Sequence, residues 1–257
     1  IKDVSEGRAA NRFLFQRLNI SYREMEAEGM YRYDLALYWR FLYEAHDDMR
    51  VLRLALEAMA RYPEGDLVAA MGTAMDRALA QVDGPFADYE ASLAAFARAN
   101  YALRLENGRC ASADLGACGG VYFDPERVYV APPLAAEATY GGGLQEIRGS
   151  IPASYGMDFI EVRLDPAVQD QPLTVTFRGE GDVARFSVQV WRMGPGEEKP
   201  RALTPAPEIV PGDGAEAHVY RIARLDVTTY DRLALIVTRL DSDETADPVG
   251  DYRITLD

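Results

Sequence analysis

The sequence predicts a two-domain α+β protein, in which an N-terminal all-α helical bundle precedes an antiparallel β-sandwich of immunoglobulin-like or jelly-roll-like type. Apolar residues recur at helical spacing from about residue 9 to residue 106, whereas beyond residue 120 they alternate with polar residues at a period of two. The length of 257 residues suits two domains of ordinary size. We therefore place the helical domain at residues 1–120 and the sandwich at residues 121–257.

The helical half divides into four main helices, preceded by a short one near residues 11–18. Residues 31–45 are apolar around more than half of the helix circumference, which is typical of a central, buried helix. The second helix carries an apolar stripe and ends at Pro63 and Gly65; the stripe consists of Met49, Leu52, Leu56 and Met59. The third covers residues 67–82, and the fourth begins at Pro85. None of these helices could bury its stripe alone, so we expect them to pack as a bundle.

The second half contains seven or eight short strand-like segments without a helix between them. Segments rich in Pro and Gly separate them, as at residues 193–200 and 205–214. This pattern is typical of an antiparallel sandwich. The predicted strands are residues 128–130, 157–164, 173–177, 186–191, 219–225, 233–238 and 252–256.

Composition and motifs exclude several classes of protein. The net charge is −14, which disfavours nucleic acid as a partner, and no run of 18 apolar residues predicts a membrane span. His-Glu-x-x-His, Gly-x-Ser-x-Gly and phosphate-binding Gly-rich motifs are absent from the sequence, and Gly141–Gly143 reads as a loop only. We therefore assign no catalytic and no cofactor-binding residue.

The two histidines lie in different predicted domains. His46 could pair with Glu44 or Asp47 as a metal or acid–base group. The interpretation we favour is a helix C-terminus, where the histidine satisfies backbone carbonyls. His218 lies in the predicted sandwich, so a site that needs two histidines would require the domains to meet.

The two cysteines indicate the compartment. Cys110 and Cys118 have seven residues between them in a Gly-rich loop, which predicts one disulfide and an oxidising environment; two free thiols are the alternative. The chain begins at Ile1 without a leader, so we expect a processed product or a segment whose beginning is missing. The predicted location is extracellular, at a bacterial cell surface or in the periplasm.

An acidic run before the last strand is the candidate metal site. Its carboxylates could hold calcium, a hard cation that prefers clustered oxygen ligands, while a solvated hairpin loop is the alternative. The four candidate ligands are Asp241, Asp243, Asp247 and Asp251. Trp191 and Tyr230 could line a sugar-binding face, although a tryptophan on an alternating strand is more typical of the core.

Three segments carry a family resemblance. They are residues 33–44 (YDLALYWRFLYE), the helix that begins at Met49, and residues 86–100 (FADYEASLAAFARAN). Their order resembles the helical subdomain downstream of the zinc site in secreted bacterial metallopeptidases of the gluzincin type. The segments 230–238 and 250–255 look like the last strands of the pre-peptidase C-terminal or immunoglobulin-like sandwich that commonly follows.

The resemblance implies a zinc motif upstream of Tyr31, but residues 1–30 contain no histidine, so no catalytic residue carries over and zinc would lie outside this chain. The chain is then either the C-terminal part of a longer peptidase or a relative without the zinc site. The first functional hypothesis is accordingly a secreted metallopeptidase-like protein, non-catalytic as given. The alternative is an extracellular structural or binding module (a surface-layer, filament or envelope-complex subunit, or a carbohydrate-binding module), with a protein or cell-surface component as its partner.

Overall fold

The computed structural model describes residues 36–61, 67–102, 134–151, 156–180, 185–195, 210–211, 219–240 and 250–257. The chain divides between Pro132 and Pro133 into two compact units, which we describe separately. The described part of the first unit is helical and that of the second is built from strands. The order of a helical half and a β half is as the sequence predicts.

The described residues of the first unit contain four short helices, and the predicted helical bundle is wrong. The helices are α4 (Ala36–His46), α5 (Arg50–Met59), α6 (Leu67–Leu79) and α7 (Tyr89–Ala102), which have only 10 to 14 residues each. Asp47, with a positive φ of 53°, follows α4 directly, and a turn region around Gly84 separates α6 from α7. Helices of this length extend about 15–21 Å. Among them α5 and α6 form the most extensive contact, whereas α4 and α7 meet at only a few positions, so the described helices do not pack evenly around one shared core.

Aromatic side chains join α4 to α7. The Tyr38 ring lies edge-on to Phe96 with centroids 5.2 Å apart, and Phe41 lies 5.3 Å from the same ring. The Tyr38 hydroxyl forms a 2.7 Å hydrogen bond with Ser92 Oγ, which itself donates to the Tyr89 carbonyl. Tyr38, Phe41 and Leu42 are at most 2% exposed, as predicted for the aromatic helix, whereas residues 31–35 of the predicted helix lie outside the described residues.

Helix α5 buries a different face from the one the sequence predicts. Its buried residues are Val51, Ala55 and Ala58, whereas Met49 and Leu56 are 60% and 59% exposed. The neighbouring α6 buries Ala74, Met75, Ala78 and Leu79. Small alanine side chains on both helices permit a close approach of their backbones, which explains why the alanine face is buried and the larger Leu56 is not.

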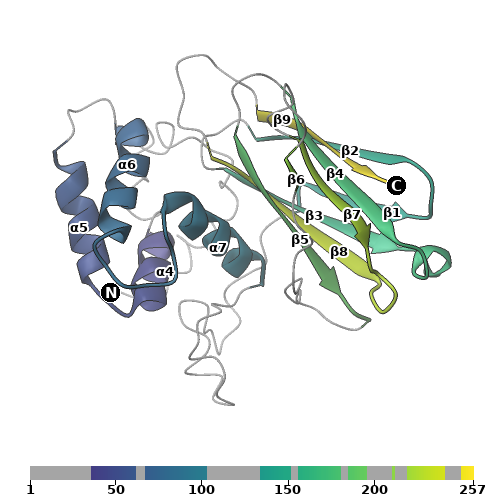
Figure 1. Cartoon of the computed structure of the whole chain (residues 1–257), viewed down its shortest axis with the longest axis horizontal. Helices are drawn as coiled ribbons and strands as arrows, with labels where there is room; N and C mark the ends of the chain where they lie inside the picture. The colour runs from purple at the N-terminus through teal and green to yellow at the C-terminus, as the bar shows by residue number, and fades with distance from the viewer. Residues whose placement is uncertain are drawn as a thin grey trace, which may run out of the picture. The chain divides into compact units, whose positions relative to one another are not determined.

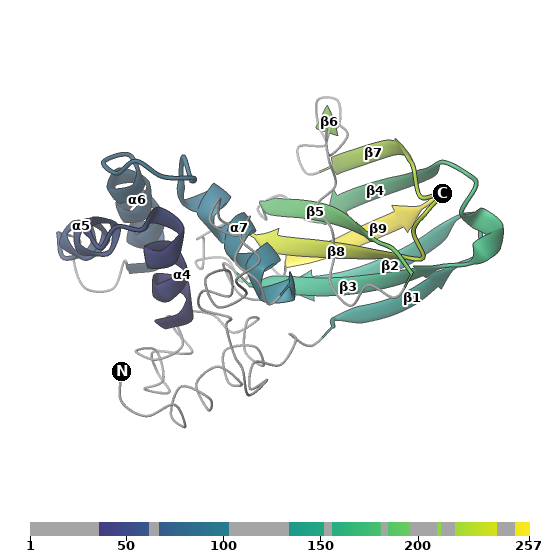
Figure 2. The same ribbon diagram turned by 90° about the horizontal axis from the view of Figure 1, so that it is seen from below.

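The second unit is a sandwich of two sheets (Figures 1 and 2). One sheet has the strand order β1-β3-β8-β5, which we call sheet A, and the other has the order β2-β9-β4-β7-β6, which we call sheet B. The strands are β1 (Ala136–Tyr140), β2 (Gln145–Ile151), β3 (Met157–Leu164), β4 (Leu173–Gly179), β5 (Phe186–Met193), β6 (Val210–Pro211), β7 (Val219–Leu225), β8 (Arg232–Arg239) and β9 (Gly250–Leu256), with a 3₁₀ turn, η3 (Pro166–Val168), between β3 and β4. The predicted strand 128–130 lies outside the described residues.

The sandwich is antiparallel with one exception among the described strands. β1 pairs with β3 in parallel, Ala136 opposite Ile160, and all other described pairs are antiparallel. The register between β4 and β7 shifts between Leu173 and Val175. Arg224, with a φ of 58°, lies in β7 opposite this shift, as expected for a bulge that increases the local twist.

Apolar side chains from both sheets fill the space between them. Ile160, Val162 and Leu235 of sheet A face Val175 and Ile254 of sheet B in one continuous core. In β8 the outward-facing side chains are buried as well: Ile236 is fully buried, like its inward-facing neighbour Leu235. The strand is therefore apolar on both faces, unlike the alternating strands of sheet B.

Two buried polar contacts join the sheets at one end of the core. The Tyr252 hydroxyl donates to Asp158 Oδ2 over 2.7 Å, and Arg239 Nη1 donates to the Ile151 carbonyl over 3.0 Å. Tyr252 reaches Asp158 across Gly149, where any Cβ would collide with the phenol ring. Burial, reinforced by the adjacent Asp158 carboxylate, raises the pKa of Tyr252, so the phenol remains a donor.

Candidate functional site

Most of the site residues predicted from the sequence lie outside the described residues. These are Cys110, Cys118, His218, Asp241, Asp243 and Asp247. Asp251 is described: it is half-buried in β9, and its carbonyl accepts a 2.8 Å hydrogen bond from the Glu180 amide. The disulfide and the calcium site therefore stay predictions. Among the described residues, no group of three or more His, Cys, Asp or Glu could hold a metal ion.

His46 ends α4 and is 8% exposed. Its ring lies edge-on to Phe86, with centroids 5.4 Å apart, and covers Gly84, where a Cβ would collide with the imidazole. Burial lowers the pKa of His46, an effect that the Asp83 backbone and the Asp48 carboxylate partly oppose. The imidazole lies at a helix end, as the structural interpretation predicts, and it packs on a phenyl ring. Both of its nitrogens are buried without a hydrogen-bond partner among the described residues, so the expected hydrogen bonds to the carbonyls of the helix end are not formed.

The two aromatic residues considered for a sugar-binding face do not form an exposed platform. Trp191 is 4% exposed, so its indole is not available for stacking on a sugar. Tyr230 is half-buried, and the Arg192 guanidinium lies 4.5 Å from the centre of its ring. Arg192 also donates to the Asp226 carbonyl over 2.8 Å, which fixes it at this place.

The exposed face of sheet B carries a row of charges that neutralise one another. Arg148, Arg253 and Arg178 lie side by side on β2, β9 and β4. Glu146 accepts from Arg148 over 2.6 Å and from Arg253 over 3.1 Å, and Glu180 accepts from Arg253 over 2.6 Å. The pKa of Glu146 is lowered chiefly by its hydrogen bond from Arg148. We interpret this network as a stabiliser of neighbouring strands, because side-by-side arginines repel unless carboxylates lie between them.

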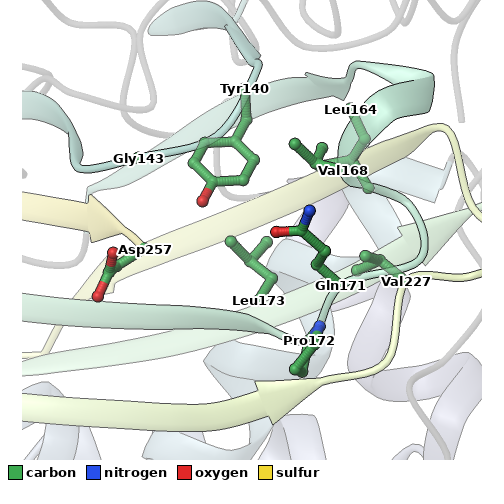
Figure 3. A pocket seen from close by; sticks show the side chains of 9 residues that line it. All are labelled: Tyr140, Gly143, Leu164, Val168, Gln171, Pro172, Leu173, Val227 and Asp257. Carbon is green, nitrogen blue, oxygen red and sulfur yellow. The ribbon is translucent and has the colours of Figure 1, made fainter.

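Among the residues that the structure describes, the candidate for a binding site is a pocket between the two sheets at one end of the sandwich (Figure 3). It has a volume of about 130 Å³ and is lined by Tyr140, Gly143, Leu164, Val168, Gln171, Pro172, Leu173, Val227 and Asp257. These residues come from the ends of β1, β3, β4 and β9 and from the turns that follow β1, β3 and β7. We call it the sandwich-end pocket.

The sandwich-end pocket has an apolar floor and a polar rim. The floor consists of Leu164, Val168, Leu173 and Val227, none more than 6% exposed. Gln171 and Asp257 at the rim are exposed. In Figure 3 the Tyr140 hydroxyl is directed to the side on which Asp257 lies, and Gln171 lies on the other side. The pocket therefore offers only a small area of aliphatic contact inside, and most of the surface that a bound molecule would meet is polar, with a hydroxyl, an amide and a carboxylate at the mouth.

Local backbone geometry builds this pocket. Asp165 Oδ1 accepts from the Ala167 amide over 2.8 Å and so caps η3, while the Asp165 amide donates to the Tyr140 carbonyl over 2.9 Å. The turn after Tyr140 contains Gly142 and Gly143 at φ of 100° and 73°, a region that strains other residues. A Cβ on Gly142 would lie 3.3 Å from Val168 Cγ1, so this turn closes directly onto the floor.

The electrostatics of the pocket favour a cation. Burial and then the nearby Asp257 carboxylate raise the pKa of Tyr140, so its hydroxyl stays protonated at neutral pH. None of the nine lining residues is basic. A bound group that donates hydrogen bonds or carries positive charge would thus meet matching groups, whereas an anion would not.

No protein-family model matches the chain, and no curated protein matches it in sequence. Similar solved structures include the pre-peptidase C-terminal domain of a collagenase from Bacillus anthracis (12% identity, TM-score 0.30, 49% of this chain and 97% of that domain). Another is the surface-associated copper-binding protein CorA from Methylomicrobium album BG8 (8% identity, TM-score 0.33, 48% of this chain and 98% of that chain). A third is a mutant of PliG, a periplasmic inhibitor of g-type lysozyme from Escherichia coli (11% identity, TM-score 0.25, 48% of this chain and 96% of that chain).

Within the described ranges, no helix has both the length and the apolar character needed to cross a membrane.

Proposed function

We propose that this chain is a non-catalytic extracellular module that binds a protein partner by taking one aliphatic side chain of that partner into the sandwich-end pocket. The pocket itself, with its buried aliphatic floor and polar mouth, is the observation that carries the proposal. The pocket thus favours the hypothesis of an extracellular binding module over that of a metallopeptidase-like protein without a binding role of its own.

The size of the pocket supports recognition of a side chain. Pockets for whole organic ligands or cofactors commonly measure about 300–1,000 Å³. At about 130 Å³ the sandwich-end pocket is well below this range, yet it is larger than a single water needs. It matches a branched side chain that projects from a larger molecule, which is how anchor residues enter protein interfaces.

The surroundings of the pocket support a protein surface as the ligand. Leu144 follows the lining residue Gly143 in the same turn and is 78% exposed. An exposed leucine beside an apolar pocket extends the contact area available to a partner, although a single such residue is common on any surface. Polar rim groups would then satisfy backbone groups of the partner next to its anchor.

The test is a selection of linear peptides on the full chain, followed by affinity measurements on two variants. Val168→Phe fills the floor of the pocket, and Val219→Phe is the matched control at a half-buried valine of β7 outside it. We expect selected peptides to share an aliphatic residue, to bind Val219→Phe like the wild type, and to lose about tenfold or more in affinity for Val168→Phe, since losing a buried anchor costs at least about 1.4 kcal/mol.

Thermal unfolding of both variants checks that the fold is retained. Peptides that bind a folded Val168→Phe variant as tightly as the wild type, or that share no aliphatic position, would show that the pocket is not the binding site.

A further inference from the structure

The arrangement of floor and rim constrains which atoms of a partner can lie at the mouth of the pocket. A side chain that fills the floor brings its own backbone nitrogen and carbonyl to the rim, because these groups are the nearest polar atoms to any Cβ. The rim groups that would meet them are the Tyr140 hydroxyl, the Gln171 amide and the Asp257 carboxylate.

The Asp257 carboxylate favours some backbone groups of a partner over others at the mouth of the pocket. A carboxylate accepts hydrogen bonds and gains most from a charged donor. A peptide amide inside a chain offers one neutral N–H, whereas a chain-terminal α-ammonium offers three N–H donors and a positive charge. A C-terminal carboxylate would meet Asp257 without a basic residue among the lining side chains to compensate.

The charge of the chain acts in the same direction. The net charge of −14 attracts cationic groups and repels anionic ones over a Debye length of about 8 Å. Tyr140 adds the edge and the hydroxyl of a nearly buried ring to the same side of the pocket as Asp257. Both features favour a small, positively charged donor at the mouth.

We infer that the sandwich-end pocket captures the amino terminus of its partner, with an aliphatic first side chain on the floor of Leu164, Val168, Leu173 and Val227 and the α-ammonium group held by Asp257, with Tyr140 and Gln171 beside it. This inference rests on the proposed function and specifies the part of the partner that is bound. Capture of a chain terminus gives selectivity for processed or newly exposed ends over internal segments of the same sequence.

Three small amides test the inference on the full chain by NMR titration. Leucine amide supplies both the side chain and the ammonium, N-acetyl-leucine amide lacks the charge, and glycine amide lacks the side chain. We expect leucine amide to bind with a dissociation constant on the order of 1 mM and to shift resonances of pocket residues, and each of the other two to bind at least about fivefold more weakly.

Two variants and a pH series identify the contact. Asp257→Asn should lower the affinity for leucine amide at least about fivefold. Glu137→Gln removes an exposed carboxylate of β1 outside the pocket and should leave this affinity unchanged. Affinity of the wild type should fall as the pH rises above about 8, where an α-ammonium group loses its proton.

The outcomes separate this inference from the proposed function. Equal binding of leucine amide and N-acetyl-leucine amide, or an unchanged affinity of Asp257→Asn, would overturn amino-terminal capture while leaving an internal aliphatic anchor in place. If leucine amide does not bind at about 20 mM while the selected peptides still depend on Val168, amino-terminal capture is also wrong and the internal aliphatic anchor remains. If neither the amides nor any selected peptide depends on the pocket, both statements are wrong.

Discussion

Single residues in this protein owe their identity to the space that a neighbour occupies. His46 and Gly84 form such a pair: the imidazole lies where the Cβ of any other residue at position 84 would be. The phenol of Tyr252 over Gly149 repeats the arrangement in the sandwich. In both cases a glycine accommodates a buried ring that also carries a polar group, so a small substitution has a large steric effect.

Gly84→Ala is expected to destabilise the protein by about 1–3 kcal/mol, because the added methyl group forces the His46 ring away from Phe86. The measurement is urea unfolding followed by circular dichroism. Gly141→Ala is the control, since a Cβ there meets no atom within 4 Å. Equal stabilities of the two variants would mean that the His46 ring repositions without cost.

His46 also predicts a dependence of stability on pH. Burial lowers its pKa in the folded state below the value of about 6.5 of an unfolded chain, so the unfolded state binds the proton more readily. The free energy of unfolding is therefore unaffected by His46 well above pH 6.5, where the imidazole is neutral in both states. It decreases as the pH falls below about 6.5 toward the folded pKa, because the unfolded state takes up the proton first. Unfolding free energies measured at a series of pH values from about 7.5 to 5 should fall more steeply for the wild type than for His46→Gln. Parallel curves would contradict the expectation.

At the scale of elements, α5 shows how far an apolar pattern predicts packing. The stripe of Met49, Leu52, Leu56 and Met59 correctly predicts a helix, but the buried face consists of Val51, Ala55 and Ala58. Hydrophobicity ranks leucine and methionine above alanine, so the pattern selects the larger residues. The contact with α6 instead depends on how close two backbones can approach, which a sequence pattern does not report.

Two substitutions at adjacent positions of α5 test whether the buried face is the alanine face or the predicted apolar stripe. Ala55→Leu should cost about 1–3 kcal/mol, because the alanine is fully buried and the larger side chain overpacks the contact with α6. Leu56→Ala should change stability by less than about 0.5 kcal/mol, because Leu56 is 59% exposed. Thermal unfolding of the two variants checks the prediction, and the reverse order would restore the stripe as the buried face.

The sequence predicts a strand well where its own side chains fill the core, and poorly where a side chain of the neighbouring strand fills the core in their place. Residues 157–164 and 219–225 match β3 and β7, because apolar residues occupy their inward positions. β1 and β2 were not predicted. In β2 the inward position of Gly149 is filled by the Tyr252 ring of the neighbouring strand, so the local sequence lacks the expected apolar residue.

The sandwich-end pocket was missed for a related reason. Its lining residues come from four separate regions of the chain, and none belongs to a motif of fixed spacing. The available signal was Gly141–Gly143, a run that by itself predicts only a loop. Two of these glycines have positive φ angles and close the turn over Val168, so a run of three glycines between strands indicated a place of close backbone approach.

At the scale of the whole molecule, sheet A is apolar on both faces of its central strand β8. Ile236→Ala, at an outward position, should therefore cost about 2–5 kcal/mol, as much as Leu235→Ala at the adjacent inward position. Thr176→Ala, at an outward position of sheet B, should cost far less because that face is partly exposed. Chemical denaturation of the three variants is the measurement, and a negligible effect of Ile236→Ala would show that its burial contributes little.

The order of strands in sheet B has a consequence for how the protein is made. β9 follows every other strand of the sandwich along the chain, yet it lies between β2 and β4 and pairs with both. During synthesis β2 and β4 therefore each keep an unpaired edge until β9 has left the ribosome. Closure of the sheet is thus a late, long-range event, and the nascent chain passes through a stage in which two edges are open to incorrect pairing.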